Sequence, residues 1–183
     1  LLLLARADAG QLKPALETMD LTVVMEHIVE DTGVLGAEAD LQLEASLAPD
    51  VIVRADPALL HTALLNLATN AVKYNEPGGT ISMKLAADGN DAVLTLGNSG
   101  PGIPADAQEH VFTRFGRVDA ARQRSVDGMG LGLSLAREIA RAHGGEVELA
   151  SSRDGWTSFV LRIPRRNSGQ PNGPPGIGEE VMD

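Results

Sequence analysis

The segment from Asp56 to Asn75 has the clearest structural pattern in the chain and reads Asp-Pro-Ala-Leu-Leu-His-Thr-Ala-Leu-Leu-Asn-Leu-Ala-Thr-Asn-Ala-Val-Lys-Tyr-Asn. Asp56 is a residue type that caps helix N-termini, and Pro57 suits the first helical position. Apolar residues then recur at helical spacing and form one stripe: Leu60, Leu64, Leu67 and Ala71. The stretch therefore predicts an amphipathic helix that packs on a core.

A second face of the same helix carries two carboxamides and an ammonium group. Asn66, Asn70 and Lys73 follow one another at spacings of four and three residues, so they share one side of the helix. A carboxamide oxygen is a hard ligand of the kind that Mg²⁺ accepts, and an ammonium group suits a phosphate oxygen. On its own this face could equally be the solvent-exposed face of an ordinary amphipathic helix.

Composition excludes several classes of protein. The hydrophobic share of 43% supports a real core, which must be aliphatic because aromatic residues make up only 3%. The net charge of −10 argues against a nucleic-acid surface, and the lack of cysteine excludes disulfides and thiolate metal sites. The longest purely apolar run, Leu1 to Ala5, is too short to cross a bilayer, and no signal peptide is visible. The chain starts without Met and in mid-pattern, so we expect a piece of something longer.

Around this helix the sequence predicts alternating helices and strands. Residues 1–11 resemble the end of a helix, a second helix starts at a Thr22 cap and runs to about residue 39, a short helix covers 105–112, and another follows Gly132. Strands are expected at 15–20, 41–47, 51–55, 80–86, 92–96, 146–151 and 156–163. From residue 167 the composition is that of a Pro- and Gly-rich tail.

A glycine-rich turn, Gly128-Met-Gly-Leu-Gly132, leads into the last of these helices. Such turns present backbone N–H groups to anions, with help from the helix dipole. The turn is not a dinucleotide fingerprint, because Leu133 stands where the third glycine belongs, and the chain has no Gly-Lys pair for a Walker A loop. Alone it would indicate no more than a hinge.

The order of five blocks is far more specific than any one of them. Asn66-Leu-Ala-Thr-Asn-Ala-Val-Lys-Tyr74, Asn98-Ser-Gly-Pro-Gly-Ile103, Phe112-Thr-Arg-Phe115, Gly128-Met-Gly-Leu-Gly-Leu133 and the segment Gly155 to Phe159 follow one another. In this order they resemble the N box, first glycine box, F box, second glycine box and closing Gly-Thr block of the catalytic ATP-binding domain of sensor histidine kinases. That domain belongs to the superfamily of gyrase, the heat-shock chaperone ATPase and the mismatch-repair ATPase.

The resemblance covers about residues 1 to 164 and implies a role for each matching position. Asn70 would hold Mg²⁺, with Asn66 as a second ligand or phosphate partner, and these two with Lys73 would form the catalytic set. Tyr74 would pack on the nucleotide, and Thr157 would bond near the adenine. Backbone approach and phosphate binding would involve Gly100, Gly102, Gly128, Gly130, Leu131 and Gly132, with Arg117 and Arg122 in a lid over the phosphates.

The resemblance also implies the architecture and the function. The fold would be an α/β two-layer sandwich with a mixed, mostly antiparallel sheet and helices on one face. Residues 1–13 would end a dimerisation helix, 14–166 would form the catalytic domain, and 167–183 would be the tail. The protein would transfer the γ-phosphate of ATP to a histidine on the dimerisation helix, for relay to a response-regulator aspartate. The whole protein would be a homodimeric inner-membrane sensor with this part in the cytoplasm, and this chain alone a monomer.

One position departs from the family pattern, and three other functions stay open. Asn98 stands where the family usually has Asp, and a neutral acceptor predicts adenine binding weaker by about 1 kcal/mol. A superfamily ATPase is disfavoured because Asn66 cannot serve as a general base for water. A stand-alone serine kinase and a nucleotide-binding regulatory module with a decayed site remain. None of the four histidines lies in a Ser-His-Glu context, so each is expected at a surface or a helix end.

Overall fold

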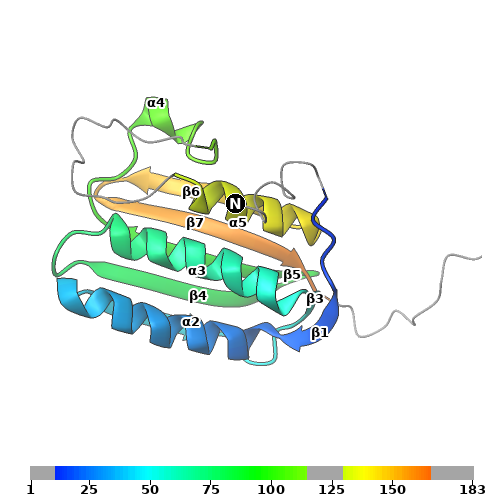
Figure 1. Ribbon diagram of the computed structural model, residues 1–183. Helices are drawn as coiled ribbons and strands as arrows, with labels where there is room; N and C mark the ends of the chain where they lie inside the picture. The colour runs from blue at the N-terminus through cyan, green and yellow to red at the C-terminus, as the bar shows by residue number, and fades with distance from the viewer. Residues whose placement is uncertain (1–10, 115–129, 166–183) are drawn as a thin grey trace, which may run out of the picture.

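The computed structural model describes residues 11–114 and 130–165, and a five-stranded sheet forms its main layer (Figure 1). The strands lie in the order β2 (Gln42–Leu47), β4 (Thr80–Asp88), β5 (Asp91–Ser99), β7 (Trp156–Pro164) and β6 (Glu146–Arg153). The β2–β4 pair is parallel and the other three pairs are antiparallel. The mixed, mostly antiparallel sheet predicted from the sequence is therefore confirmed.

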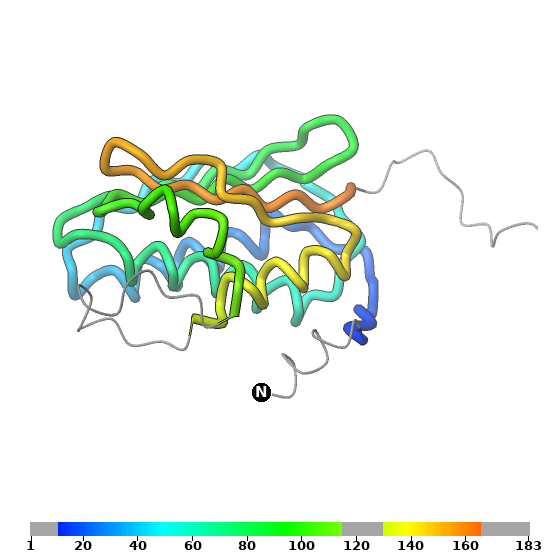
Figure 2. The backbone as a smooth tube through the Cα atoms, turned by 90° about the horizontal axis from the view of Figure 1, so that it is seen from above, coloured from blue at the N-terminus to red at the C-terminus, as the bar shows by residue number. Residues whose placement is uncertain are grey.

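Three helices cover one face of this sheet, as the view from above shows (Figure 2). They are α2 (Leu21–Gly36), α3 (Pro57–Lys73) and α5 (Gly132–Ala142). The apolar stripe predicted on α3 is buried, with Leu60, Leu64, Leu67 and Ala71 at most 1% exposed. The aliphatic core lies between these helices and the strands, so the opposite side of α3 is left to carry polar groups.

Smaller elements connect the layers. β1 (Glu17–Asp20) pairs antiparallel with β3 (Ile52–Ala55) in a separate two-stranded sheet. A short 3-10 helix (Ala37–Ala39) follows α2, and α4 (Ala105–Gln108) follows β5. Among the described residues, no helix has both the length and the apolar character needed to cross a bilayer.

Several boundaries differ from the sequence expectations. The α2 cap is Asp20, whose Oδ1 accepts from the Thr22 N–H at 2.9 Å, so Thr22 is inside the helix and the predicted cap was wrong. Thr22 has another partner: its hydroxyl donates to the Ala48 carbonyl at 2.9 Å. The central hairpin is longer than predicted, because β4 and β5 stay paired as far as Ile81 and Asn98. Helix α4 is shorter than predicted and ends at Gln108.

Asp56 caps α3 as predicted and also holds the chain before β1. Its carboxylate accepts from the N–H of Leu59 at 3.1 Å and from the N–H of Ala15 at 2.9 Å. Burial alone would raise the pKa of Asp56, but these backbone hydrogen bonds outweigh it and hold the pKa below its usual value. The carboxylate therefore joins the N-terminal segment to the start of the helix that carries the candidate site.

His143 completes this junction from the end of α5. Its Nε2 lies 3.0 Å from the Asp56 backbone nitrogen, and its Nδ1 lies 2.7 Å from the Ile139 carbonyl oxygen. A backbone N–H only donates, so Nε2 must accept and Nδ1 must carry the proton that it gives to Ile139. His143 is at a helix end as expected, but it is buried, with 8% of its surface exposed.

Replacing His143 by Ala is expected to lower the free energy of unfolding by about 2 kcal/mol or more. The change leaves a cavity and removes the acceptor of the Asp56 N–H. Urea unfolding of the whole chain measures the effect. His27→Ala on exposed α2 surface is the control, with an expected change within about 0.5 kcal/mol. Equal effects of the two changes would show that the junction contributes no stability.

Candidate functional site

A cavity of about 330 Å³ opens between α3, the end of β5, the start of β7 and the start of α5. It brings together ten of the residues predicted from the sequence: Asn66, Asn70, Lys73, Tyr74, Asn98, Gly102, Gly130, Leu131, Gly132 and Thr157. These residues come from four separate blocks of the chain, so the fold gathers the motifs in one place. Arg117, Arg122 and Gly128 lie outside the described residues.

The α3 side of the cavity carries Asn66, Asn70 and Lys73, each partly exposed. The Asn66 side-chain nitrogen donates to the Thr62 carbonyl at 2.8 Å, so its oxygen is left for other contacts. The Asn70 carboxamide has no hydrogen-bond partner among the described residues, although it lines a cavity. Lys73 Nζ lies 5.7 Å from the centroid of the Tyr74 ring. This face thus lines the cavity with two carboxamides and the Lys73 side chain.

The start of α5 forms the facing wall. Gly130, Leu131 and Gly132 line the cavity, and the Leu131 side chain makes no capping hydrogen bond. An N-terminus of this kind offers N–H groups and the positive end of the helix dipole to an anion. A Cβ on Gly132 would lie 2.8 Å from the Asn66 Oδ1, so any side chain at residue 132 would displace the Asn66 carboxamide.

Asn98 and Thr157 lie directly opposite each other on β5 and β7, at the deep end of the cavity. Both are buried, with 4% and 6% of their surfaces exposed. The Asn98 side-chain nitrogen donates to the Ser99 carbonyl at 2.7 Å and to the Tyr74 carbonyl at 3.4 Å. Its oxygen is therefore the group left to face a ligand.

These bonds change the expectation for residue 98. A carboxylate there would set an anionic oxygen against two carbonyl oxygens, unless the side chain turned away from its present position. This repulsion cannot be seen in the sequence, and it opposes the gain of about 1 kcal/mol expected from a charged acceptor.

Gly100 serves the fold more directly than the ligand. Its φ is +141°, and an added Cβ would lie 2.4 Å from the Tyr74 carbonyl oxygen, which belongs to the end of α3. Gly100 is not among the residues that line the cavity, whereas Gly102 is. A glycine is needed at residue 100 because the chain after β5 passes close to Tyr74, the C-cap residue of α3.

An apolar wall, which sequence reasoning missed, also lines the cavity. It includes Ile103, Val111 and Phe159. Phe112 meets Phe159 edge to face, with 6.0 Å between the ring centroids. The F box was the available signal, since an aromatic residue in a polar segment needs a packing partner. Trp156, unexplained by the sequence, packs against Gly97, where a Cβ would lie 2.5 Å from its ring.

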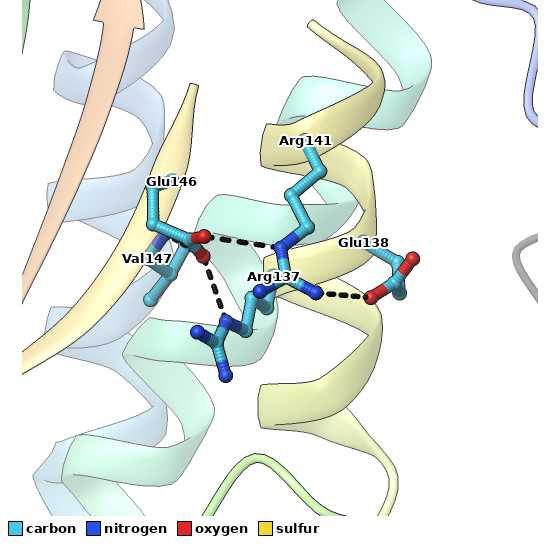
Figure 3. Close-up of polar contacts among 5 residues, drawn as sticks. All are labelled: Arg137, Glu138, Arg141, Glu146 and Val147. Carbon is cyan, nitrogen blue, oxygen red and sulfur yellow. Dashed lines mark hydrogen bonds and ion pairs between the residues drawn. The ribbon is translucent and has the colours of Figure 1, made fainter. Parts of the chain in front are cut away.

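Arg137 on α5 supports this wall from behind. Its guanidinium carbon lies 4.7 Å from the centroid of the Phe112 ring, and its Nε donates to Glu146 at 2.7 Å. Arg141 also donates to Glu146, at 3.0 Å, and pairs with Glu138 at 3.2 Å (Figure 3). Burial raises the pKa of Glu146, but the bonds from the two arginines outweigh it and hold the pKa below its usual value.

Glu146→Gln is expected to lower the free energy of unfolding by up to about 1 kcal/mol at pH 7, because the pair is about one third exposed. A carboxyl whose pKa is lowered by folding stabilises the fold above its unfolded pKa of about 4.3. That contribution is lost as the pH falls through the lower pKa of the folded state. Unfolding curves of parent and variant should therefore converge towards pH 3. A difference that persists there would exclude the charge as its cause.

The donor set fits a nucleotide with Mg²⁺. Among the described residues, no group of three or more His, Cys, Asp or Glu side chains is placed to hold a metal ion. Mg²⁺ commonly takes only one or two protein ligands beside phosphate and water. Asn70 would offer an oxygen to the cation, and Lys73 and the start of α5 would place positive charge beside the phosphates.

Comparison with known proteins agrees with this geometry. The profile of the family described as "Histidine kinase-, DNA gyrase B-, and HSP90-like ATPase" matches residues 55–167. The chain is 36% identical over 166 residues to the Mycobacterium tuberculosis (strain ATCC 25618 / H37Rv) protein named "Probable sensor histidine kinase TcrY", covering 90% of this chain and 34% of that protein. It is 35% identical over 178 residues to the histidine-protein kinase AfsQ2 of Streptomyces coelicolor, covering 97% and 32%. The chain thus spans about a third of the length of these relatives.

Solved structures share the fold. The mycobacterial sensor histidine kinase MprB superposes with a TM-score of 0.71 at 32% identity, covering 82% of this chain and 99% of that one. Full-length ShkA in complex with AMPPNP superposes with a TM-score of 0.74 at 27% identity, covering 89% and 34%. On the family match, the fold and the gathered motifs, the chain belongs to the family of histidine kinase-, DNA gyrase B- and HSP90-like ATPases.

Proposed function

We propose that this chain is the catalytic ATP-binding domain of a two-component sensor histidine kinase, with residues 14–166 as the domain. The observation that carries the proposal is the cavity in which Asn70, Lys73 and the α5 N-terminus face Asn98 and Thr157. The sensor kinases among the relatives and the AMPPNP complex of ShkA support it. The whole protein would act as a homodimer, with its acceptor histidine outside residues 1–183 and a response-regulator aspartate as the final acceptor.

Different residues would bind the base and the phosphates of ATP. Asn98 and Thr157 would bind the base, with Tyr74 and the apolar wall against its ring. Lys73 and the N–H groups at the start of α5 would bind phosphate oxygens, and Asn70, with Asn66 beside it, would hold Mg²⁺. The bound cation would neutralise charge on the phosphates, as phosphoryl transfer requires. The chain's own contribution is to position ATP and stabilise its charge.

Water is a poor acceptor at this site. The Asn66 carboxamide is too weakly basic to act as a general base. Its side-chain nitrogen already donates a hydrogen bond to the Thr62 carbonyl. The histidines within the described residues are equally unsuited to accept phosphate from this cavity. None of His27, His61, His110 and His143 lines it, and His143 is bonded through both ring nitrogens.

Incubation with γ-labelled ATP and Mg²⁺ separates the candidate functions. We expect this chain to bind ATP, release little phosphate and stay unlabelled, and the full-length protein to gain acid-labile label typical of phosphohistidine. Acid-labile label on this chain alone would refute the placement of the acceptor. Phosphate release that disappears in Asn70→Ala would favour an ATPase. Acid-stable label on a protein substrate would favour a serine kinase.

A further inference from the structure

Ser152 lies behind the base end of the cavity and is not part of any motif discussed above. Its hydroxyl oxygen accepts from the Ile103 N–H at 2.6 Å and lies 2.9 Å from the Thr157 hydroxyl oxygen. Gln108 reinforces the same place, donating to the carbonyls of Ile103 at 2.8 Å and Ser152 at 3.2 Å. The loop after β5 is thereby fastened to the β6–β7 hairpin.

The polarity of this network follows from what each group can do. The Ile103 N–H can only donate, so the Ser152 oxygen accepts from it. Among the described residues, the acceptor within reach of the Ser152 hydroxyl proton is the Thr157 oxygen. If Ser152 donates to Thr157, the Thr157 proton is free to point at a ligand in the cavity that this residue lines.

The neighbouring group has the opposite polarity. The Asn98 nitrogen is bonded to the carbonyls of Ser99 and Tyr74, so its oxygen is the acceptor offered to the cavity. Since Asn98 and Thr157 are direct partners across β5 and β7, an acceptor and a donor stand side by side.

We propose that Ser152 is a positioning residue that orients the Thr157 hydroxyl as a donor, so that Asn98 and Thr157 together select a 6-aminopurine over a 6-oxopurine. The inference rests on the proposed function. Adenine offers an amino donor at position 6 and an acceptor at N1, which match this pair. A 6-oxopurine offers an acceptor and an N1–H donor, which oppose it at both positions. A water between Thr157 and the base preserves the polarity, because it accepts from the hydroxyl and donates onward.

Calorimetric titration with ADP and inosine diphosphate, which differ in this edge of the base, tests the proposal. The parent chain should prefer ADP by about tenfold or more. Ser152→Ala should reduce this preference severalfold, because the Thr157 hydroxyl can then turn and accept from N1–H. Thr157→Val, which removes the donor but keeps the shape, should do the same. Ser152→Thr, which retains the hydroxyl, should keep the parent preference.

Gln108→Ala is the control for loosening of the loop. It removes the fastening bonds and leaves the hydroxyl pair intact, so it should weaken both nucleotides by a similar factor and keep their ratio. The proposal is overturned if Ser152→Ala and Thr157→Val also keep the parent ratio. If the parent chain binds neither nucleotide, it is the proposed function that fails.

Discussion

Asn70→Ala is expected to remove nearly all of the gain in nucleotide affinity that Mg²⁺ provides. The Asn70 carboxamide lines the cavity from α3 and has no hydrogen-bond partner among the described residues, so its oxygen is available to the cation. In titrations with a fluorescent ATP analogue, affinity with Mg²⁺ should fall by about tenfold or more and affinity without Mg²⁺ by less than about twofold. Phosphoryl transfer by the full-length protein should fall by about 10²-fold or more.

Asn90→Ala makes the same chemical change in the exposed β4–β5 turn and serves as the control. It should alter neither affinity. An equal loss with and without Mg²⁺ in Asn70→Ala would mean that Asn70 acts through the structure of α3 and holds no cation. Unfolding curves of the two variants would then differ as well.

Gly100→Ala is expected to lower the free energy of unfolding by about 3 kcal/mol or more and to weaken nucleotide binding by more than tenfold. The new methyl would lie 2.4 Å from the Tyr74 carbonyl oxygen, and the φ of +141° is strained for any residue with a side chain. Because the obstacle is backbone, β5 must move away from α3. The Tyr74 carbonyl also accepts from Asn98, so this movement reaches a residue that lines the cavity.

Gly89→Ala separates conformational strain from the clash. Gly89 has a φ of +57° in the β4–β5 turn, but no atom lies within 4 Å of its added Cβ. This variant should lose about 1 kcal/mol of stability and bind nucleotide normally. Denaturant unfolding and calorimetry measure both quantities. Similar losses in the two variants would show that the contact with Tyr74 is unimportant.

The layered fold was predicted from the resemblance to the family, and the individual helices and strands were predicted from local signals. The apolar stripe and the Asp56 cap both predict a helix that begins at Pro57 and packs on the core, and both predictions are confirmed. Element ends were less certain, since a cap such as Asp20 or Thr22 depends on which side chain reaches the first turn. The ladder beyond Leu96 could not be read from a glycine-rich segment that usually indicates a turn.

Residues that line the cavity were predictable where they belong to a motif, and residues that hold those positions from behind were not. Asn70 and Lys73 belong to a motif, but Ser152, Gln108 and Arg137 owe their places to contacts between segments distant in the sequence. Whether an amide or a carboxylate suits residue 98 depends on two nearby carbonyl oxygens, those of Tyr74 and Ser99. Their positions cannot be predicted from residue types in the sequence. Arg117 and Arg122 stay predictions from the resemblance alone.

The most direct test of the central claim is calorimetric titration of the parent chain with a non-hydrolysable ATP analogue in the presence of Mg²⁺. We expect saturable binding at one site, stronger with Mg²⁺ than without it, and loss of that difference in Asn70→Ala. No binding, or binding that neither Mg²⁺ nor Asn70→Ala changes, would contradict the assignment of the cavity as an ATP–Mg²⁺ site.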